Sequence, residues 1–251
     1  MKPTPYTNHT VLALDETDST NRYLKDYLAQ HPDAPEGITV VAKFQTAGRG
    51  QKGNTWESEA DKNLLFSTAL FPSFLKAKHQ FLISEITTLA IRETLSDLAG
   101  HITIKWPNDI YWNDRKICGM LIENNLNGMY MEQCVIGVGI NINQAEFRST
   151  APNPISLKQI TGKEHDCAEI LERILDKLAF YYEMLQTNDE EEIYRRYTEV
   201  LYRKDGLHPF KDKDGEFEAA IERIEPDGFL VLRRKNGDTQ RYAFKEVAFV
   251  L

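Results

Sequence analysis

Residues 44–56 carry the densest group of side chains and glycines that could bind an anion. Glycines at positions 48, 50 and 53 let the backbone take positive φ angles, so that several N–H groups can converge on one ligand. Arg49 and Lys52 add positive charge within the same loop. Backbone donors combined with a guanidinium suit a carboxylate or a phosphate. The segment therefore predicts an anion-binding loop, with a glycine-rich hairpin tip that binds nothing as the alternative.

Two common nucleotide-binding motifs are excluded for this loop. Residues 48–53 match G-x-G-x-x-G after a predicted strand, but a dinucleotide fingerprint needs a helix that starts at the third glycine. Residues 54–63 show no apolar periodicity, so no helix is predicted there. The P-loop string, which ends in Gly-Lys-Ser or Gly-Lys-Thr, does not occur in the chain.

A carboxylate and a second lysine follow in a hairpin. Residues 105–109 read Lys-Trp-Pro-Asn-Asp, which leaves the Asn108 amide and the Asp109 carboxylate at a strand end. Lys116 starts the returning strand after the Asn113-Asp114 turn. Taken singly, these residues are explained as turn residues and a solvated lysine. Together with the loop they suit a negatively charged nucleotide and an acidic group.

Two further polar groups lie near strand ends. Ser19 and Thr20 precede the apolar pattern of a helix, so either is a good N-cap, and the cap is the simpler explanation of the cluster with Asn21. A helix N-terminus with spare hydroxyls can also bind polar ligand atoms. Asn141 and Asn143 alternate at the end of a predicted strand over 130–143, which predicts that they share one face.

The remaining pattern predicts an α+β fold. The expected helices cover 77–99, ending at Gly100, then 166–185 and 190–201, and most expected strands pair with their neighbours in sequence. Consecutive strands around one long helix favour a mixed, largely antiparallel sheet over βαβ units. Residues 211–251 are strand-like, with turns at 226–228 and 236–238, and predict a small antiparallel barrel.

Composition narrows the class of protein. The length of 251 residues allows one sizeable core with a small appendage. A net charge of −8 argues against a nucleic-acid partner, and no apolar run reaches the length of a membrane span or a signal peptide. The cysteines, at positions 118, 134 and 167, are scattered without metal-ligand spacing. We therefore expect a cytoplasmic protein with inert thiols.

Five motifs in one order carry a family resemblance. They are Asp18-Ser-Thr-Asn21, the loop 48–56, Lys105-Trp-Pro-Asn-Asp109, Lys116-Ile-Cys-Gly-Met-Leu-Ile-Glu123 and Gly137-Val-Gly-Ile-Asn141. With these motifs the chain resembles the biotin–protein ligase family, also called biotin–carboxylase ligases. The resemblance covers about residues 15–145. It implies a class II synthetase-like catalytic domain over 1–205 and an SH3-like β-barrel over 206–251.

The resemblance also implies an activity. Such enzymes use ATP and Mg²⁺ to convert biotin into biotinyl-5′-AMP, and then transfer biotin to one lysine of a biotin carboxyl carrier domain. Adenylation supplies the leaving group that a carboxylate lacks. Cations and Mg²⁺ would neutralise the two anions that meet in the first step. The second step needs a neutral amine, although a free lysine, with a pKa of about 10.4, is protonated at neutral pH.

Site residues follow from the matching positions. The resemblance implies biotin contacts from Ser19, Thr20, Asn21, Gln45, Arg49, Gly50, Gln51, Lys116 and Gly119. It implies ATP or adenylate contacts from Arg49, Asn54, Trp56, Asn108, Lys116 and Asn141. Arg49, Lys116 and Asp109 are the expected catalytic residues, with Asp109 orienting and deprotonating the incoming lysine. The metal site is unknown, with Asp109 and Asn108 as the candidate location.

This chain departs from the family pattern in two places. The commonest family loop is Gly-Arg-Gly-Arg-Arg-Gly-Arg, whereas Gln51, Lys52 and Asn54 stand at three of its arginine positions here, so their roles are open. Only about 14 residues precede Asp15, too few for the winged-helix DNA-binding domain of bifunctional members, which predicts a ligase that is not a repressor. The carrier protein is open, as is the oligomeric state, for which a homodimer is one alternative. Two other functions stay open, a lipoate–protein ligase or octanoyltransferase and a non-catalytic biotin-sensing module.

Overall fold

The computed structural model describes residues 9–51, 54–148 and 153–250. Its main sheet has seven strands in the order β1-β2-β3-β7-β6-β5-β4. The strands are β1 (Val11–Thr17), β2 (Thr39–Gln45), β3 (Leu64–Leu70), β4 (Ile102–Lys105), β5 (Asp109–Trp112), β6 (Arg115–Asn127) and β7 (Tyr130–Ile140). β1 and β2 are parallel, and the other neighbours are antiparallel. The predicted α+β class with a mixed, largely antiparallel sheet is confirmed.

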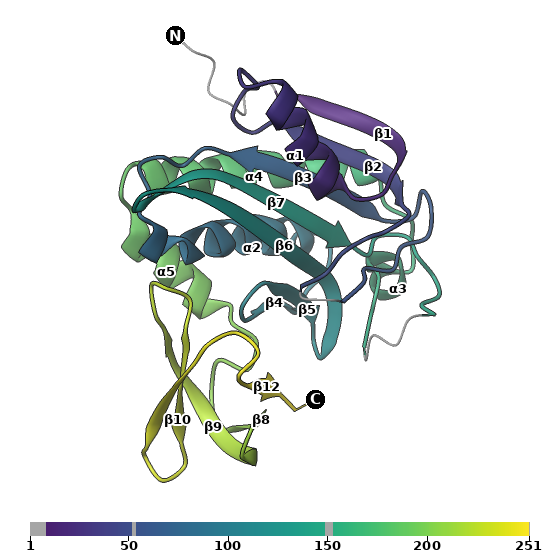
Figure 1. Cartoon of the computed structure of the whole chain (residues 1–251). Helices are drawn as coiled ribbons and strands as arrows, with labels where there is room; N and C mark the ends of the chain where they lie inside the picture. The colour runs from purple at the N-terminus through teal and green to yellow at the C-terminus, as the bar shows by residue number, and fades with distance from the viewer. Residues whose placement is uncertain (1–8, 52–53, 149–152, 251) are drawn as a thin grey trace.

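Helix α1 (Thr20–Gln30) connects the parallel strands β1 and β2 and packs on β2, β3 and β7. Parallel neighbours cannot be joined by a tight hairpin, so a crossover such as this helix is required. Leu24 of α1 is buried against Val40 of β2 and Val135 of β7. This packing places the start of α1 on one face of the sheet, which Figure 1 shows near β2 and β3.

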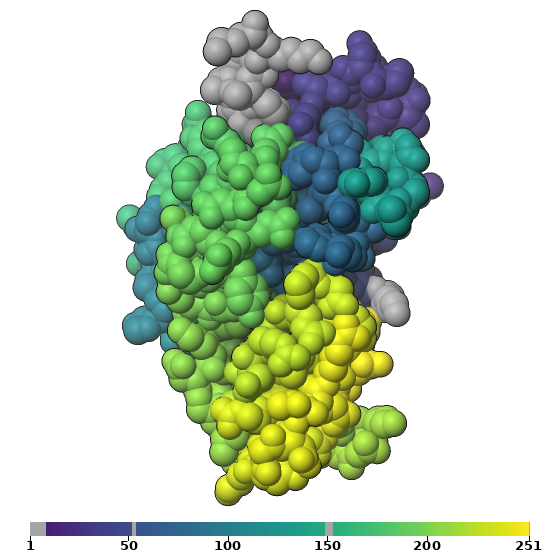
Figure 2. Space-filling view, turned by 90° about the vertical axis from the view of Figure 1, so that its left-hand side faces the viewer, coloured from purple at the N-terminus to yellow at the C-terminus, as the bar shows by residue number. Residues whose placement is uncertain are grey.

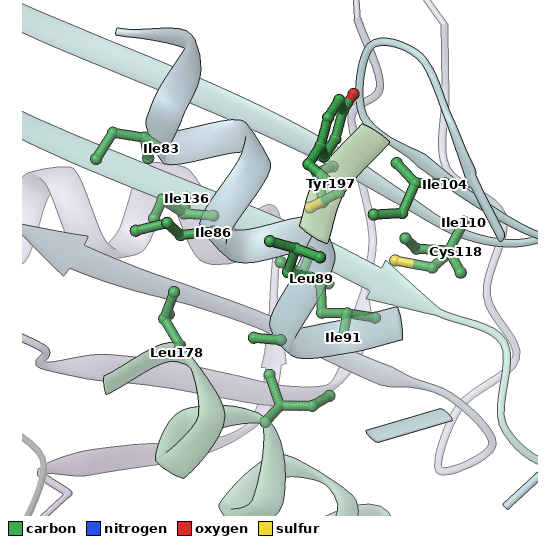
Figure 3. Packing of buried hydrophobic residues seen from close by; sticks show 14 of the residues in the cluster. Ile83, Ile86, Leu89, Ile91, Ile104, Ile110, Cys118, Ile136, Leu178 and Tyr197 are labelled. Atoms are coloured by element: carbon green, nitrogen blue, oxygen red, sulfur yellow. The ribbon is translucent and has the colours of Figure 1, made fainter. Parts of the chain in front are cut away.

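The opposite face of the sheet carries the main hydrophobic core. Helix α2 (Phe81–Ser96) packs there against α4 (Cys167–Gln186) and α5 (Glu190–Glu199). Figure 3 shows Ile86 and Leu89 of α2 among Ile136 of β7 and Leu178 of α4. Because side chains alternate along a strand, Ile136 faces this core while Val135 and Gly137 face α1. The two faces of β7 therefore have separate tasks, one structural and one available to ligands.

Two local predictions are wrong, and one short helix was missed. The helix expected over 77–99 is a 3₁₀ turn, η1 (Ala77–His79), followed by α2, which ends four residues before Gly100. The residue with positive φ after α2 is His101, at 62°. β7 ends at Ile140, so Asn141 and Asn143 do not share a strand face; their amides bond to the backbone of Ile155 and His165. A short helix α3 (Leu157–Thr161), capped by Ser156, was not predicted.

A second sheet follows α5. Its strands are β8 (His208–Asp212), β9 (Gly215–Ile224), β10 (Leu230–Arg234), β11 (Thr239–Tyr242) and β12 (Ala248–Phe249), all paired antiparallel in the order β11-β10-β9-β8-β12. It lies beyond α5 and beside β4 and β5, and Figure 2 shows it against the helical part of the chain. Phe210 and Leu230 belong to the same buried cluster as α2. The SH3-like description and the division at residue 205 stay predictions.

Candidate functional site

Three glycines leave bare backbone on the sheet face that carries α1. Gly119 of β6 pairs with Gly139 of β7, and Gly137 lies two residues earlier on the same face. A Cβ at Gly137 would lie 2.1 Å from Asn21 Oδ1, and a Cβ at Gly139 would lie 2.4 Å from the Trp56 ring. We call Gly119, Gly137 and Gly139 the glycine patch. It allows Asn21 and Trp56 to rest directly on the sheet.

Trp56 ends a narrow hairpin that follows β2. The hairpin is held by the bonds from Gly50 N to Asn54 O (2.7 Å) and from Trp56 N to Gly48 O (3.0 Å). The indole lies against the Cβ positions of Gly119 and Gly139, and the Lys116 Nζ lies 5.9 Å from its centroid. Trp56 Nε1 is buried without a hydrogen-bond partner. A buried donor of this kind needs an acceptor, which a ligand on the patch would supply.

A buried polar cluster joins α1 to β2 and β3. Thr20 N donates to Gln45 Oε1 at 2.8 Å, and Asn21 Nδ2 donates to Leu121 O at 3.2 Å. Ser67 Oγ of β3 lies 2.7 Å from Thr20 Oγ1 and 2.6 Å from Asn21 Oδ1. We call Thr20, Asn21, Gln45 and Ser67 the polar cluster. These contacts hold its amides and hydroxyls in one arrangement next to Gly137.

Ser19 occupies the predicted N-cap position of α1, yet its side chain makes no capping hydrogen bond. Gln45 accepts the first free N–H of the helix, that of Thr20, in its place. The predicted N-cap position is therefore confirmed, but the Ser19 hydroxyl does not supply the capping hydrogen bond. The capping acceptor is the Gln45 side chain at the end of β2, and it connects the first turn of α1 to the loop that follows β2.

Asp109 and Lys116 form an ion pair at the other end of the glycine patch. The Lys116 Nζ lies 2.7 Å from Asp109 Oδ1, and the two side chains are 32% and 25% exposed. Asp109 pairs with Gly119 across β5 and β6, so its carboxylate lies on the patch side of the sheet. Asn108 is turned inward and donates to Met120 O at 2.6 Å. A cation and a carboxylate thus face the patch, while Asn108 braces the turn.

Lys105, which we had not predicted as a site residue, stands opposite Asp109 in the β4–β5 pair. Its Nζ donates to Tyr111 OH at 3.0 Å and lies 4.4 Å from the centre of that ring. Burial lowers the pKa of Lys105 to about 8, which the Asp109 charge opposes. Its place directly across from Asp109 in the Lys-Trp-Pro-Asn-Asp hairpin was the signal in the sequence.

Asn141 is buried just beyond β7. Its Nδ2 donates to Ile155 O at 3.1 Å, whereas its Oδ1 is buried without a partner. Because Asn141 follows the glycine patch along the chain, this orphan acceptor and the orphan donor of Trp56 belong to the same region of the sheet. Together they suit a ligand that both donates and accepts, as a nucleobase edge does.

The described part of the glycine loop is largely exposed. Arg49 and Asn54 are exposed, and Gly50 serves the hairpin with its backbone N–H. Gln51 keeps a buried Oε1 without a partner. Lys52 and Gly53 lie outside the described residues. The expected contacts of these residues with ligand stay predictions.

Glu123 of β6 receives two hydrogen bonds beside the polar cluster. Asn21 Nδ2 donates at 2.9 Å and Lys25 Nζ at 2.8 Å. Burial raises the pKa of Glu123, but these two bonds and the charges of Lys25 and Arg49 outweigh it and lower that pKa below its usual value. Glu123 is therefore an anion at neutral pH.

A metal site is not evident in the described part of the chain. Among the described residues, no group of three or more His, Cys, Asp or Glu side chains is placed so that it could hold a metal ion. One oxygen of Asp109 is held by Lys116, and the Asn108 amide nitrogen is bonded to Met120 O. Asp109 and Asn108 therefore do not form a protein cage for Mg²⁺.

A hollow of about 590 Å³ lies elsewhere, between η1, α5 and the β9–β10 turn. Its polar lining includes Arg223, which pairs with Glu225 at 2.8 Å. His79, Glu225 and Asp227 there are also paired with other side chains, and the hollow does not adjoin the glycine patch. We therefore place the candidate site on the glycine patch.

Five residues of this site were missed from the sequence. Ser67, Glu123, Lys105, Gly137 and Gly139 had no assigned role. The spacing of Gly137 and Gly139 was a usable signal, because two glycines at i and i+2 empty one face of a strand. Ser67 carried no signal, since its importance comes from the pairing of β3 with β7.

The comparison with known proteins now decides the family. The profile of the Biotin/lipoate A/B protein ligase family matches residues 13–141, which span β1 to the end of β7. The chain belongs to this family. The matched segment contains the polar cluster, the glycine patch and the Asp109–Lys116 pair.

Two curated relatives and one solved structure are similar to this chain. The chain is 35% identical over 150 residues to the bifunctional ligase/repressor BirA of Bacillus subtilis, covering 57% of this chain and 45% of that protein. It is 28% identical over 233 residues to the biotin--[acetyl-CoA-carboxylase] ligase of Paracoccus denitrificans, covering 89% and 94%. The Aquifex aeolicus biotin protein ligase, solved with biotin and ATP, superposes with a TM-score of 0.77 at 23% identity, covering 95% and 97%. The last match concerns the fold alone. The chain spans less than half of the Bacillus relative's length.

Proposed function

We propose that the protein is a biotin–protein ligase, which joins biotin to AMP with ATP and then transfers biotin to a lysine of a biotin carboxyl carrier domain. The observation that carries the proposal is the order of groups along one sheet face. The polar cluster, the glycine patch with Trp56, and the Lys116–Asp109 pair follow one another. This order suits a ligand with a neutral polar head, an apolar middle and an anionic end, and biotin has that order.

The polar cluster favours biotin over lipoate. A ureido ring offers two N–H donors and one carbonyl acceptor, which fit the hydroxyl of Thr20 and the amide of Gln45. A dithiolane ring offers neither kind of group, so buried polar atoms would stay unpaired, at a cost of about 1–3 kcal/mol each. The lipoate or octanoyl alternative remains within the family, and parallel calorimetric titrations with biotin and lipoate would separate them.

In the first step a biotin carboxylate oxygen attacks the α-phosphorus of ATP. A P–O bond to the carboxylate forms, and the bond to the β-phosphate breaks to release pyrophosphate. Lys116 lies where it could neutralise both anions as they approach, and Arg49 would add charge when the hairpin contacts ligand. Fixed cations at such positions lower the barrier because they need no reorganisation. Trp56 and Asn141 would take the adenine, through the unpartnered Nε1 and Oδ1.

In the second step the neutral lysine of the carrier attacks the acyl carbon. The amide C–N bond forms, and the C–O bond to AMP breaks. Asp109 would accept the proton that the amine loses, once Lys116 turns from Asp109 toward the phosphate. The carboxylate is suited to this because its partner is a single flexible cation, and both are partly exposed to the incoming chain.

Partners and location are part of the proposal. We expect a carrier domain as protein substrate and no nucleic-acid partner, with the homodimer open. None of the described helices has the length and apolar character needed to cross a bilayer. Cys118 and Cys134 are buried, and burial raises the pKa of both thiols, which supports a cytoplasmic protein with inert cysteines.

Biotin-dependent exchange of labelled pyrophosphate into ATP tests the first step, and transfer of labelled biotin to a carrier domain tests the second. Both signals are expected, and both should need biotin and ATP. Biotin binding with neither signal would instead support the non-catalytic sensor. Binding of lipoate in preference to biotin would support the lipoate or octanoyl alternative.

A further inference from the structure

We propose that Glu123 sets the direction of the hydrogen bonds in the polar cluster and thereby decides which ligand atoms Thr20 and Gln45 recognise. The inference rests on the proposed function, because the recognised group is the ureido ring of biotin. Glu123 lies outside the predicted biotin contacts, and it acts through Asn21 and Ser67. It is therefore a positioning residue.

The orientation of the Asn21 amide is fixed by acceptors. Its nitrogen faces Leu121 O at 3.2 Å and Glu123 Oε2 at 2.9 Å. A backbone carbonyl and a carboxylate can only accept, so the amide NH₂ must point at them. The Asn21 oxygen must then face Ser67 Oγ, 2.6 Å away. Ser67 has to donate its single proton there.

The direction of the hydrogen bond between Thr20 and Ser67 follows from the number of hydroxyl protons available. Ser67 Oγ and Thr20 Oγ1 are 2.7 Å apart, a distance that requires a proton between two oxygens. Because the Ser67 hydroxyl already donates its one proton to Asn21 Oδ1, Thr20 must donate to Ser67. The longer contact of 3.1 Å from Thr20 Oγ1 to Gln45 Oε1 then carries no proton. Thr20 is left with lone pairs only for any further partner.

Gln45 has the opposite polarity. Its Oε1 accepts from the Thr20 backbone N–H, which can only donate, so its NH₂ faces away from α1 and lies 3.4 Å from the Cβ position of Gly48. The cluster thus presents one acceptor, Thr20, and one donor, Gln45. A ureido N–H fits the first, and the ureido carbonyl fits the second.

Glu123 holds this arrangement because it is charged. Hydrogen bonds to a carboxylate are roughly twice as strong as neutral ones, and the bond from Lys25 at 2.8 Å keeps Glu123 in place. A glutamine at this position could donate to Asn21 Oδ1. Leu121 O, at 3.2 Å, would then be the one fixed acceptor that still favours the present Asn21 orientation, so the amide could turn over more readily, and the protons of Ser67 and Thr20 would reverse with it.

The test compares biotin with its two cyclic carbamate analogues, in each of which an oxygen replaces one ureido N–H. Calorimetric titration of the wild-type protein should show one analogue binding about 100-fold more weakly than biotin, since a recognised N–H is lost against a lone pair. In Glu123→Gln, biotin should bind about 10-fold more weakly and the discrimination should fall below about 10-fold. Glu132→Gln makes the same chemical change at an exposed position of β7 and should leave both values unchanged.

Unchanged discrimination in a folded Glu123→Gln protein would overturn the inference. If that variant failed to fold, Ser67→Ala would replace it, because it breaks the link between Asn21 and Thr20 and should abolish the same discrimination. Retained discrimination in Ser67→Ala would also overturn the inference. A wild-type protein that bound no biotin would overturn the proposed function, and this inference with it.

Discussion

At the scale of single residues, the Lys116–Asp109 pair is the part of the site that contributes least to folding. Both side chains are partly exposed, and pairs of this kind contribute about 0–1 kcal/mol to stability. Their geometry is therefore unexplained by the needs of the fold. An ion pair that hardly stabilises the protein, beside a bare stretch of backbone, is consistent with two charges kept ready for a reaction.

Lys116→Ala should lower biotin-dependent pyrophosphate release by at least 100-fold, because one charge-stabilising donor contributes about 3–4 kcal/mol to the transition state. The melting temperature should change little. Lys43→Ala, which removes a lysine from an exposed pair with Asp15, is the matched control and should keep full activity. Pyrophosphate release near the wild-type rate in Lys116→Ala would remove Lys116 from the mechanism.

Arg49→Gly should let biotinyl-AMP escape, because it removes the described cation of the loop and adds a fourth glycine to residues 48–53. Free adenylate acylates any nearby lysine, so labelling of bystander proteins should rise. Streptavidin blotting of a mixture with serum albumin measures it. Equal bystander labelling by both proteins would show that Arg49 does not retain the adenylate.

At the scale of elements, the alternation of β7 divides its residues between core and site. Its even positions 134–140 are buried against α2, whereas Gly137 and Gly139 leave room for side chains from α1 and the loop. The strand is stabilised by the first face and can therefore tolerate glycine on the second.

Gly137→Ala should raise the biotin Kd by at least about 10-fold, since its Cβ would lie 2.1 Å from Asn21 Oδ1 and must displace that side chain. Titration calorimetry measures the change. Gly100→Ala, whose Cβ would meet nothing within 4 Å, should bind biotin like the wild type. A wild-type Kd in Gly137→Ala would mean that Asn21 has no part in binding.

Helix α2 carries a buried acid that makes its packing pH-dependent. Glu85 is 3% exposed, and its Oε2 has no hydrogen-bond partner. Burial, with a smaller contribution from Glu190, raises the pKa of Glu85 from 4.5 to about 8. The folded state therefore binds this proton more tightly than the unfolded state. The contribution of protonated Glu85 to the free energy of unfolding is fully present below pH 4.5 and is lost as the pH rises to about 8.

Glu85→Gln should remove that loss. Its free energy of unfolding should exceed that of the wild type by about 3–5 kcal/mol at pH 8 and match it near pH 4.5, at about 1.4 kcal/mol per unit of pKa. Urea unfolding at both pH values measures the difference. An equal difference at the two pH values would show that Glu85 does not titrate in this window.

At the scale of the whole molecule, the second sheet is tied to the hairpin that carries Asp109. Trp106 Nε1 donates to Gly228 O at 2.9 Å, and Ser84 Oγ of α2 donates to Pro107 O at 3.0 Å. Gly228 has a φ of 90°, and its Cβ position lies 2.7 Å from Phe81. The β9–β10 turn therefore fits between α2 and Trp106 only because residue 228 is glycine.

Gly228→Ala should destabilise the protein by about 2–4 kcal/mol, through strained φ and a clash with Phe81. Gly237→Ala shares the positive φ, at 93°, but meets nothing within 4 Å, so it should cost only about 1–2 kcal/mol. Denaturant unfolding measures the free energy of unfolding of both variants, and the difference between them gives the contribution of the contact with Phe81. Equal losses would mean that the turn does not hold the two sheets together.

The sequence by itself determined the family and the kinds of chemistry. The family followed from the resemblance carried by five motifs in one order, and the chemistry followed from glycines near cations and a proline-fixed turn before Asp109. The spacing of apolar residues also predicted most helices and strands, because each element must bury one face and this fixes the period of its apolar positions. It misplaced the end of α2 and the strand position of Asn143, where contacts from distant loops decide.

Only the tertiary structure decided which groups meet. Ser67 and Asn21 are 46 positions apart, and Asn21 and Glu123 are 102 apart, yet each pair is in hydrogen-bond contact. Strand pairing produces such contacts, and no local pattern encodes which strands become neighbours. The direction of the protons in the polar cluster depends on those neighbours, because acceptors from β6 orient an amide from α1.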